Sequence, residues 1–415
     1  MPGYILIDHC QICNNPTEEV LSLGSLPLVD GLITPVGGTE TEIQRYPVRL
    51  LYCPHCQLVG LGCIVDKELL FPLDYPYRSG TTKILRDNFV ELARETEKFI
   101  KLDKKDLVVD IGCNDGTLLG NFKNRAQVLG ITPENMGQLA VGKGINVIQS
   151  YFTPEISQRI SSEHGQAKVI TATNVLAHFK PIDETIKSIK RLLKPDGIFI
   201  SESGYLFSML EGLQYDSIHH EHLRYYSLTS LKYLFEKHGF EIIRAKRIAT
   251  HGGSLRIYSA HQGQYPIDAS VVDLLKEEEK KKLSPELLRD FRSKVMEHKS
   301  DLQQLLAGIK STHKTIQGIG APGRATVLMN YTGIDNSILD NVVETEGSYK
   351  IGKIIPGTKL RIASEQEFFI KQPDYALMLS WHIADELMPK LKMRGYRGDF
   401  ILPLPKAMII RNQDV

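Results

Sequence analysis

The stretch from Leu107 to Phe122 constrains the fold more than any other part of the sequence. Residues 107–111 form an apolar run of strand length, and a Gly-Cys-Asn-Asp-Gly turn then leads into Thr-Leu-Leu-Gly-Asn-Phe. A buried strand, a glycine turn and a helix in this order predict the first βα unit of a doubly wound parallel sheet, which binds ligands at the carboxyl edge of its strands. Gly112 and Gly116 would let the backbone approach such a ligand closely.

The charges at this turn limit the class of ligand. The pattern is neither Gly-x-Gly-x-x-Gly nor a P-loop, because no Gly-Lys-Ser/Thr sequence follows. Asp110 and Asp115 would repel a pyrophosphate, and they suit a cationic or hydroxyl-bearing ligand. The sequence VDIGCNDG resembles motif I of the S-adenosylmethionine-dependent methyltransferases, in which acidic groups face the ligand's amino group and ribose. In that fold an acidic residue normally binds the ribose about 20 residues further on, and Thr132 occupies the position here, with Glu134 two residues away.

Further strand and helix units follow this turn. AKVITATNVLAHF predicts a strand that ends near Asn174, and LLKPDGIFISES predicts a helix, a Pro-Asp-Gly turn and a strand that carries Glu202. This succession, from about residue 106 to residue 203, predicts a methyltransferase-like domain. The resemblance implies that S-adenosylmethionine is held by Asp110, Gly112, Asn114, Asp115, Gly116, Thr132, Asn174 and His178.

Two Cys-x-x-Cys pairs precede this domain, Cys10 with Cys13 and Cys53 with Cys56. Two intervening residues let a tight turn aim both thiolates of a pair at one cation, and four thiolates suit tetrahedral Zn²⁺. A redox dithiol is the alternative, but no thioredoxin-like βαβ pattern surrounds either pair. The sequence therefore predicts a small zinc-binding module with a structural role.

Residues 219–222 read His-His-Glu-His. Three imidazoles and a carboxylate this close together could bind a metal, transfer protons or lie in a solvated loop. The i, i+1, i+3 spacing of the histidines differs from the i, i+4 pattern of zinc hydrolases, which disfavours a metal site. An imidazole has the pKa that a general base needs near neutral pH.

The last third of the chain predicts a second α/β unit. Mixed charges in residues 266–312 are typical of a solvated helical connector with i, i+4 ion pairs. HKTIQGIGAPGRATVLMNYTGI then predicts a strand, a glycine turn and a helix, and LDNVVET and DYALMLSW predict further strands. The turn at residues 318–324 suits an anionic group at a helix N-terminus, reinforced by Arg324.

Several motifs in one order resemble the nucleotide-sugar C-methyltransferases, which place a branching methyl group on deoxysugars. The similar stretches are TNVLAH, HHEHLRYYSL, THGGSLR, GAPGRATVLMNY and KIIPGTKL, and with the four cysteines they cover nearly the whole chain. His219 stands where the family usually has tyrosine, and VETEGSYK, which ends at Lys350, departs from the family's aspartate-containing pattern. The resemblance implies an α/β protein in three parts: a zinc-binding module at 1–71, a Rossmann-like methyltransferase domain at 72–265, and a helical connector with a second Rossmann-like, nucleotide-sugar-binding domain at 266–415.

The family resemblance also implies a reaction and its residues. Methyl transfer from S-adenosylmethionine to carbon 3 of a nucleotide-linked 4-keto-deoxysugar would pass through an enolate, with His222 as the general base. Glu221 would fix the tautomer of His222 or hold a sugar hydroxyl, and His219 could donate to the enolate oxygen. Tyr77 resembles the aromatic loop that closes over the family's site, and Tyr75 is its close competitor. Implied substrate-binding residues are His251, Gly253, Ser254, Arg256, Gly320, Arg324, Asn330 and Lys350, although Arg256, on a predicted strand, could equally be a surface charge.

Composition limits the classes of binding partner and the cellular locations that we expect. A formal net charge of +1 gives no excess that favours nucleic acid or a membrane surface. The chain has no apolar run near the roughly 20 residues that span a bilayer, and its first residues lack a secretory signal pattern. We therefore expect a cytoplasmic protein, for which a monomer is compatible with the sequence. Two alternatives from other classes are an O- or N-methyltransferase on another small molecule and a non-catalytic zinc- and nucleotide-binding homologue.

Overall fold

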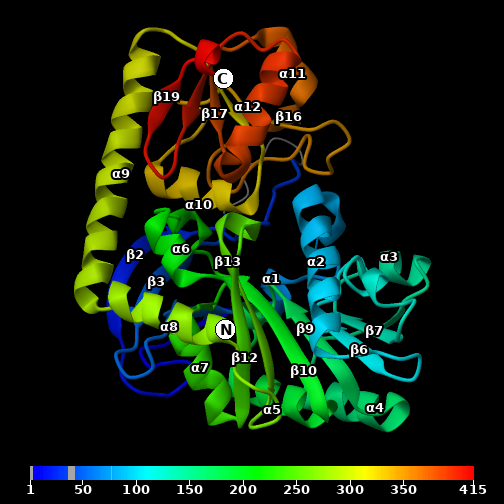
Figure 1. The fold of residues 1–415 in the computed structure, drawn as a ribbon. Coiled ribbons are helices and arrows are strands. Elements are labelled where there is room, and N and C mark those ends of the chain that lie inside the picture. The colour runs from blue at the N-terminus through cyan, green and yellow to red at the C-terminus, as the bar shows by residue number, and fades with distance from the viewer. Residues whose placement is uncertain (1–2, 36–42, 76) are drawn as a thin grey trace.

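The computed structural model describes residues 3–35, 43–75 and 77–415. The predicted α/β class is confirmed: a small N-terminal module with the four cysteines, a Rossmann-like sheet and a second, C-terminal sheet follow one another along the chain (Figure 1). In the described part of the chain, every helix is too short or too polar to cross a membrane.

The N-terminal module, residues 3–71, is built on two small antiparallel sheets. One pairs β1 (Tyr4–Leu6) with β5 (Cys63–Val65), and α1 (Lys67–Leu70) follows. The other has the order β11-β4-β3-β2 and consists of β2 (Glu18–Leu26), β3 (Tyr46–Tyr52), β4 (Val59–Leu61) and β11 (Arg224–Tyr225). Because β11 directly follows His219–His222, that motif is joined to the module by strand pairing.

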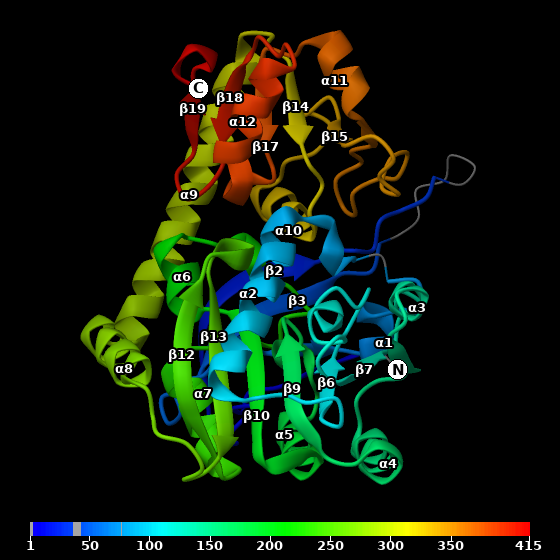
Figure 2. The same cartoon turned by 45° about the vertical axis from the view of Figure 1, so that its right-hand side comes forward.

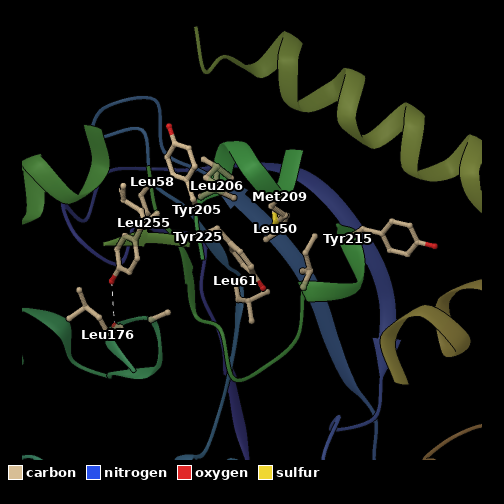
Figure 3. Close-up of a cluster of buried hydrophobic side chains, with 14 of the residues drawn as sticks. Leu50, Leu58, Leu61, Leu176, Tyr205, Leu206, Met209, Tyr215, Tyr225 and Leu255 are labelled. Carbon is tan, nitrogen blue, oxygen red and sulfur yellow. Dashed lines mark hydrogen bonds between the residues drawn. The ribbon is translucent and has the colours of Figure 1, made fainter. Parts of the chain in front are cut away.

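Apolar packing also joins this module to the middle domain. One buried cluster contains Leu50, Leu58 and Leu61 of the module and Leu176, Leu206, Met209 and Leu255 of the middle domain (Figure 3). Burial of a leucine side chain contributes about 1.5–3 kcal/mol to stability. The module and the middle domain therefore share a core and hold each other in place.

The middle domain is a seven-stranded sheet with the order β12-β13-β10-β9-β6-β7-β8. Its strands are β6 (Leu107–Ile111), β7 (Gln127–Thr132), β8 (Asn146–Gln149), β9 (Ala167–Thr173), β10 (Leu193–Gly204), β12 (Phe240–Ile248) and β13 (Ser254–His261). Only β13 runs against its neighbours β10 and β12. The chain proceeds from β6 to β8 and returns to β9 on the other side of β6, so the topological switch point lies between β6 and β9. Doubly wound sheets bind their ligands at this point.

Six helices of the middle domain flank or cap this sheet: α2 (Lys83–Phe99), α3 (Gly137–Gly142), α4 (Pro154–His164), α5 (Ile182–Leu192), α6 (Leu206–Glu211) and α7 (Leu228–Lys237). Apolar residues at helical spacing before the first strand, Leu85, Phe89 and Leu92 among them, predict a helix, and α2 forms there and buries all three. The helix predicted after the glycine turn is wrong. Residues 119–121 form only a 3-10 turn, because glycine and asparagine, which recur there, are weak helix formers.

The C-terminal domain is a six-stranded sheet with the order β16-β15-β14-β17-β18-β19, parallel except for β19. Its strands are β14 (Ile316–Ile319), β15 (Val342–Glu344), β16 (Ile362–Ser364), β17 (Tyr375–Met378), β18 (Asp399–Leu402) and β19 (Met408–Ile410), and its helices are α10 (Gly323–Thr332), α11 (Glu365–Lys371) and α12 (Ala384–Met393). The predicted connector consists of α8 (Ala269–Lys281) and α9 (Pro285–Ser311). The connector breaks where Ser284 caps α9 and Pro285 occupies its first turn.

The C-terminal domain also contacts the N-terminal module. Ile33 and Ile354 exchange two backbone hydrogen bonds of 3.0 and 2.9 Å, and Thr326 Oγ1 of α10 donates to the carbonyl of Val29 at 3.3 Å. Figure 2 shows α10 next to β2 of the module, above the middle sheet. The three parts therefore meet around the carboxyl edge of the middle sheet.

Candidate active site

The turn after β6 is shaped for close approach. Gly112 and Gly116 have φ values of 77° and 73°, which favour glycine. A Cβ atom on Gly112 would lie 2.4 Å from Val175 Cγ1, so the turns after β6 and β9 touch at the switch point. Asn174, in the second of these turns, also has a positive φ of 58°. The structure thus brings Gly112 next to the turn that contains Asn174, whereas Gly116 faces Ala140 and Ile145.

We expect Gly112→Ala to weaken S-adenosylmethionine binding at least about tenfold, because a left-handed alanine is strained and its methyl group would displace Val175. Isothermal calorimetry measures the Kd. Gly120→Ala is the matched control, since a Cβ atom there meets nothing within 4 Å, and its Kd should stay within about twofold of the original. Equal binding by both variants would contradict the close contact between the two turns.

The carboxylates of this turn are engaged by the protein. Asp110 is 2% exposed and accepts a hydrogen bond of 2.7 Å from Thr171 Oγ1, and its burial raises its pKa to about 7. Asp115 accepts hydrogen bonds from Thr117 and forms ion pairs with Arg78 (3.3 Å) and Lys143 (3.5 Å). Burial opposes ionisation of Asp115, but the Thr117 hydrogen bonds and the Lys143 charge hold its pKa below the usual value. Asp115 therefore already has cationic partners in the folded chain.

Two other predicted cofactor residues have clear local roles. Asn114 donates to the carbonyl of Tyr77 and accepts from the amide of Ser79, both at 2.9 Å, so it ties the aromatic loop to the turn after β6. Thr132 ends β7, and its hydroxyl donates to the Glu134 carboxylate. Glu134 thus supplies a carboxylate beside Thr132, which occupies the position where this fold normally has an acidic residue.

The four cysteines converge on one point. Their sulfur atoms all lie within 4.8 Å of one another, with Cys10–Cys56 and Cys13–Cys53 separations of 3.4 Å. A tetrahedral zinc ion with Zn–S bonds of about 2.3 Å needs sulfur separations of roughly 3.8 Å, so the cluster fits the ion. Within the described ranges, no other group of histidine, cysteine or carboxylate side chains gathers in this way, and the HHEH motif does not form a metal site.

The HHEH loop, residues 217–223, directs its side chains to different places. His222 lies in a column of rings, with ring centroids 4.1 Å from His219 and 5.4 Å from His178, and Phe71 continues the column 5.1 Å beyond His178. His220 points the other way, and its Nε2 donates to the carbonyl of Tyr46 in the N-terminal module at 3.1 Å. The alternative of three solvated loop histidines is wrong, because His219 and His220 are 7% and 1% exposed.

A backbone carbonyl sets the tautomer of His222. Its Nδ1 lies 3.2 Å from the oxygen of Ser217, and a carbonyl can only accept, so Nδ1 carries the proton. Nε2 is therefore left with a free lone pair. Burial, followed by the charge of Arg324, lowers the pKa of His222 to about 4 despite the hydrogen bond to Ser217, which keeps the ring neutral at pH 7.

Glu221 does not fix that tautomer, which corrects one expectation from the sequence. Its Oε2 instead accepts a hydrogen bond of 2.9 Å from Tyr75 Oη. Burial, and then the nearby charge of Asp30, raises the pKa of Glu221 well above its usual value. Burial also raises the pKa of Tyr75 well above 10. Of the two candidate tyrosines, Tyr75 contacts the HHEH loop, whereas Tyr77 is 41% exposed.

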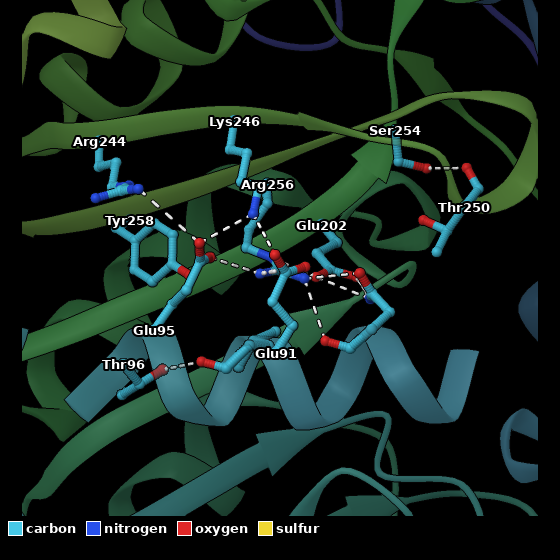
Figure 4. Close-up of polar contacts among 12 residues, drawn as sticks. Glu91, Glu95, Thr96, Glu202, Arg244, Lys246, Thr250, Ser254, Arg256 and Tyr258 are labelled. Carbon is cyan, nitrogen blue, oxygen red and sulfur yellow. Dashed lines mark hydrogen bonds and ion pairs between the residues drawn. The ribbon is translucent and has the colours of Figure 1, made fainter. Parts of the chain in front are cut away.

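Arg256 is not a surface charge. It is 0% exposed, and its guanidinium binds Glu202 (2.6 Å), Glu95 (2.8 Å) and Asn88 (2.7 Å) (Figure 4). This network holds α2 against β10 and β13. All of its strong donors are used by protein groups, so the prediction of a substrate contact is corrected to a structural role.

The HGGS turn before β13 lies against the C-terminal domain. His251 is close enough to His222 for protonation of one ring to oppose protonation of the other. Gly253 has a φ of 115°, and a Cβ atom there would meet Ser208 at 2.6 Å. Ser254 is buried, and its hydroxyl donates to the carbonyl of Thr250 at 3.0 Å. Gly253 and Ser254 therefore shape the turn.

The predicted anion site in the C-terminal domain is occupied by protein groups. Arg324 binds both carboxylate oxygens of Asp216 at 2.6 and 3.2 Å and lies over the ring of Trp381, whose Nε1 donates to the same carboxylate at 2.7 Å. The amide of Ala321 donates to Glu344 Oε1 at 2.8 Å. Arg324 thus connects the C-terminal domain to the start of the HHEH loop.

The remaining residues of that predicted set have internal partners too. Lys350 Nζ donates to the carbonyl of Ala321 at 2.6 Å, and Asn330 Nδ2 donates to the carbonyl of Pro356 at 2.9 Å. Gly320 has a φ of 79° and packs against Ser380. Gly320 and Arg324 thus belong to the turn that Lys350 contacts through Ala321, while Asn330 supports the Pro-Gly-Thr turn.

Sequence reasoning missed Asp30, Asp216 and Trp381. Asp30 follows an ordinary apolar run, so nothing local marks it, yet its charge acts on Glu221 across a domain boundary. Asp216 lies three residues before His219, and an acidic residue so close to the motif was a usable signal.

Comparisons with known proteins agree with this architecture. Family models match a zinc binding domain at residues 10–71, a methyltransferase domain at 84–245 and a C-methyltransferase C-terminal domain at 249–405. The C-methyltransferase NovU of Streptomyces niveus is 30% identical over 410 residues, which cover 97% of each chain.

Two solved structures resemble part of the fold. The N-methyltransferase NodS from Bradyrhizobium japonicum is 14% identical with a TM-score of 0.35 and covers 47% of this chain and 95% of its own. The magnesium protoporphyrin IX methyltransferase from Synechocystis PCC 6803 is 15% identical with a TM-score of 0.31 and covers 43% and 78%.

The switch-point turns and the matched methyltransferase domain define an S-adenosylmethionine-dependent methyltransferase. More narrowly, the chain belongs to the C-methyltransferase family, since it matches NovU over nearly its whole length and carries that family's C-terminal domain. Its cofactor is S-adenosylmethionine, and Cys10, Cys13, Cys53 and Cys56 form its zinc site.

Proposed function

We propose that the protein methylates carbon 3 of a nucleotide-linked 4-keto-deoxysugar through an enolate. The observation that carries this proposal is the state of His222: its Nδ1 is bound to a backbone carbonyl, its Nε2 is free, and its ring is neutral. An O- or N-methyltransferase needs only to deprotonate a hydroxyl or an amine. A carbon acid beside a ketone needs both a neutral base and a donor for the developing oxyanion.

In the proposed reaction, His222 Nε2 takes the proton from carbon 3, and the C–H electron pair becomes the enolate. The turns at 112–116 and 174–178 would hold S-adenosylmethionine, which would supply a sulfonium methyl group. The enolate carbon would bond to this methyl group as the C–S bond breaks and its electron pair leaves with sulfur. His222 then releases its proton to solvent. Burial raises the pKa of Tyr75 and of Glu221, and the Tyr75 hydroxyl donates to Glu221 Oε2. In its protonated form, Glu221 would be a neutral donor for the ketone oxygen. His219, whose Nδ1 is buried without a partner, is a further donor.

The proposal also assigns each of the two ligands to a domain. We infer that the cofactor occupies the turns at 112–116 and 174–178, with Glu134 near its ribose, and that the nucleotide lies toward the C-terminal domain. Arg324 and Lys350 are basic residues on that side. A phosphate group there would compete with Asp216 for Arg324.

The test uses ¹³C-methyl-labelled S-adenosylmethionine with nucleotide-linked 4-keto-6-deoxy sugars and locates the label by NMR. A methyl group on carbon 3 supports the proposal. Label on an oxygen or nitrogen, or no transfer to any keto sugar, rejects it.

The pH dependence of kcat/KM gives a separate prediction. Only the unprotonated form of His222 can act as the base, and burial lowers the pKa of His222 to about 4. Activity should therefore persist as the pH falls through 6.5, where an ordinary imidazole protonates, and be lost only near pH 4. Circular dichroism at each pH separates this loss from unfolding. An acid limb near pH 6.5 in a folded enzyme would contradict the buried, neutral state of His222.

A further inference from the structure

The HHEH loop is attached to the N-terminal module through its backbone. β11 pairs with β4, with Arg224 opposite Gly60 and Tyr225 opposite Val59. One residue earlier, the carbonyl of Leu223 accepts a hydrogen bond of 2.9 Å from the amide of Leu61. His222 is thus next in sequence to Leu223, the first residue whose backbone the module binds.

Gln11 adds a side-chain link from the cysteine cluster itself. It lies between Cys10 and Cys13, and its Nε2 donates to the carbonyls of Leu61 (2.9 Å) and Leu223 (3.0 Å). Because both partners are carbonyl oxygens, only the NH₂ end of the amide can face them. A Cβ atom on Gly60 would lie 3.2 Å from Gln11 Nε2 and 3.0 Å from the Leu223 oxygen, so a bare glycine keeps space for this bridge.

The backbone of Leu223 also binds the turn after β9, which carries His178 of the ring column. The amide of Leu223 donates to the carbonyl of Ala177 at 3.0 Å. Ala177 precedes His178, whose ring stacks on His222 with centroids 5.4 Å apart. The Leu223 backbone therefore links three segments: the cysteine cluster through Gln11, the turn after β9 through Ala177, and the HHEH loop through its own neighbour His222.

We propose that Gln11 is a positioning residue for catalysis, which transmits the rigidity of the zinc-bound Cys10–Cys13 turn to the backbone beside His222. Gln11 acts only through Leu223 and contacts no reacting atom. This inference rests on the proposed role of His222, since a precisely held base is needed only if that imidazole moves the proton. Misplacing a reacting group by about 1 Å can cost on the order of 100-fold in rate.

The test compares two variants that separate hydrogen bonding from shape. Gln11→Ala removes the donor, and Gln11→Glu keeps the shape but points a carboxylate at two carbonyl oxygens. If the donor matters, both variants lose kcat, by roughly 10- to 100-fold, and Gln11→Glu is at least as impaired as Gln11→Ala. If Gln11 only fills space, Gln11→Glu is the milder change, and the proposal is overturned.

Asn15→Ala is the matched control. Asn15 carries an amide in the same cysteine turn, but it donates at 3.4 Å to the carbonyl of Cys13, within the module. Asn15→Ala should keep kcat within about twofold. Both Gln11 variants should keep one zinc per chain by mass spectrometry and the original Kd for S-adenosylmethionine. Zinc loss, or an equal loss of kcat in Asn15→Ala, would assign the effect to the module's integrity and overturn the proposal.

Amide hydrogen exchange provides a readout that does not depend on the reaction. In Gln11→Ala, exchange in a peptide covering residues 218–226 should quicken by about tenfold, with residues 107–132 unchanged. Unchanged exchange in 218–226 would refute the mechanical link. If the loop loosens while the wild-type enzyme methylates no carbon, the proposed function fails and the link stands. If the loop loosens and carbon methylation proceeds at the normal rate, the positioning role fails.

Discussion

Substituting His222 by asparagine should lower kcat for methyl transfer by about 10²- to 10⁴-fold, the usual contribution of a general base. Asparagine can keep the hydrogen bond to the Ser217 carbonyl through its amide, but it has no basic nitrogen to take the place of Nε2. The Kd for S-adenosylmethionine should change by less than about threefold, because His222 contacts the turns at 112–116 and 174–178 only through its stacking on the ring of His178. Single-turnover kinetics and calorimetry measure the two quantities separately.

His261→Asn is a suitable control for this substitution. His261 ends β13, and its ring also hydrogen-bonds to a backbone carbonyl, that of Leu193, at 3.3 Å. Since β13 is antiparallel to β10, this end of the strand lies at the opposite edge of the sheet from the ring column. The control should keep nearly full activity. Parallel loss of kcat and of cofactor affinity in His222→Asn would instead indicate a structural role for that ring.

Replacing Arg256 by methionine should reduce the free energy of unfolding by about 3–5 kcal/mol, the cost of leaving buried charges without a partner. Glu202 is 0% exposed, and it would keep only the two hydrogen bonds from Asn88 Nδ2, at 3.2 and 2.9 Å. Glu95 would keep Lys246 at 2.9 Å and Tyr258. Urea unfolding followed by circular dichroism measures the change.

Arg247→Met tests whether burial of the ion pairs causes the loss of stability that we expect for Arg256→Met. Arg247 lies on the neighbouring strand β12 and pairs with Glu211 and Glu277, but its side chain is 38% exposed. An exposed ion pair contributes about 0–1 kcal/mol, so this variant should be nearly as stable as the original. A destabilisation of Arg256→Met that is no larger than that of Arg247→Met would contradict the structural role assigned to the network in Figure 4.

Features fixed by local sequence could be predicted. The strand at Leu107–Ile111 and the helix of residues 83–99 follow from apolar spacing, and the tight turn after the strand follows from glycine placement. The four-cysteine cluster follows from the Cys-x-x-Cys spacing. Each of these signals lies in a short segment, or in two short segments that carry the same pattern, so the surrounding structure need not be known.

Features that depend on distant partners could not be predicted in this way. Arg256 alternates with apolar residues on its strand, and only α2, more than 150 residues earlier in the chain, shows that it is a buried ion-pair partner. The turn at residues 318–324, which contains Arg324, has the composition of a phosphate site, but Asp216 from another domain binds the Arg324 guanidinium. The tautomer of His222 is set by the carbonyl of Ser217, and a backbone atom leaves no trace in sequence.

The central claim, that a neutral His222 enolises a ketone, is tested most directly without methyl transfer. The enzyme is incubated in D₂O with the 4-keto sugar nucleotide and S-adenosylhomocysteine, which fills the cofactor site but carries no methyl group, and NMR follows the proton on carbon 3. We predict exchange of that proton with the original enzyme and its loss in His222→Asn. An enzyme that methylates its substrate but leaves this proton unexchanged, or exchanges it equally well without His222, would contradict the account.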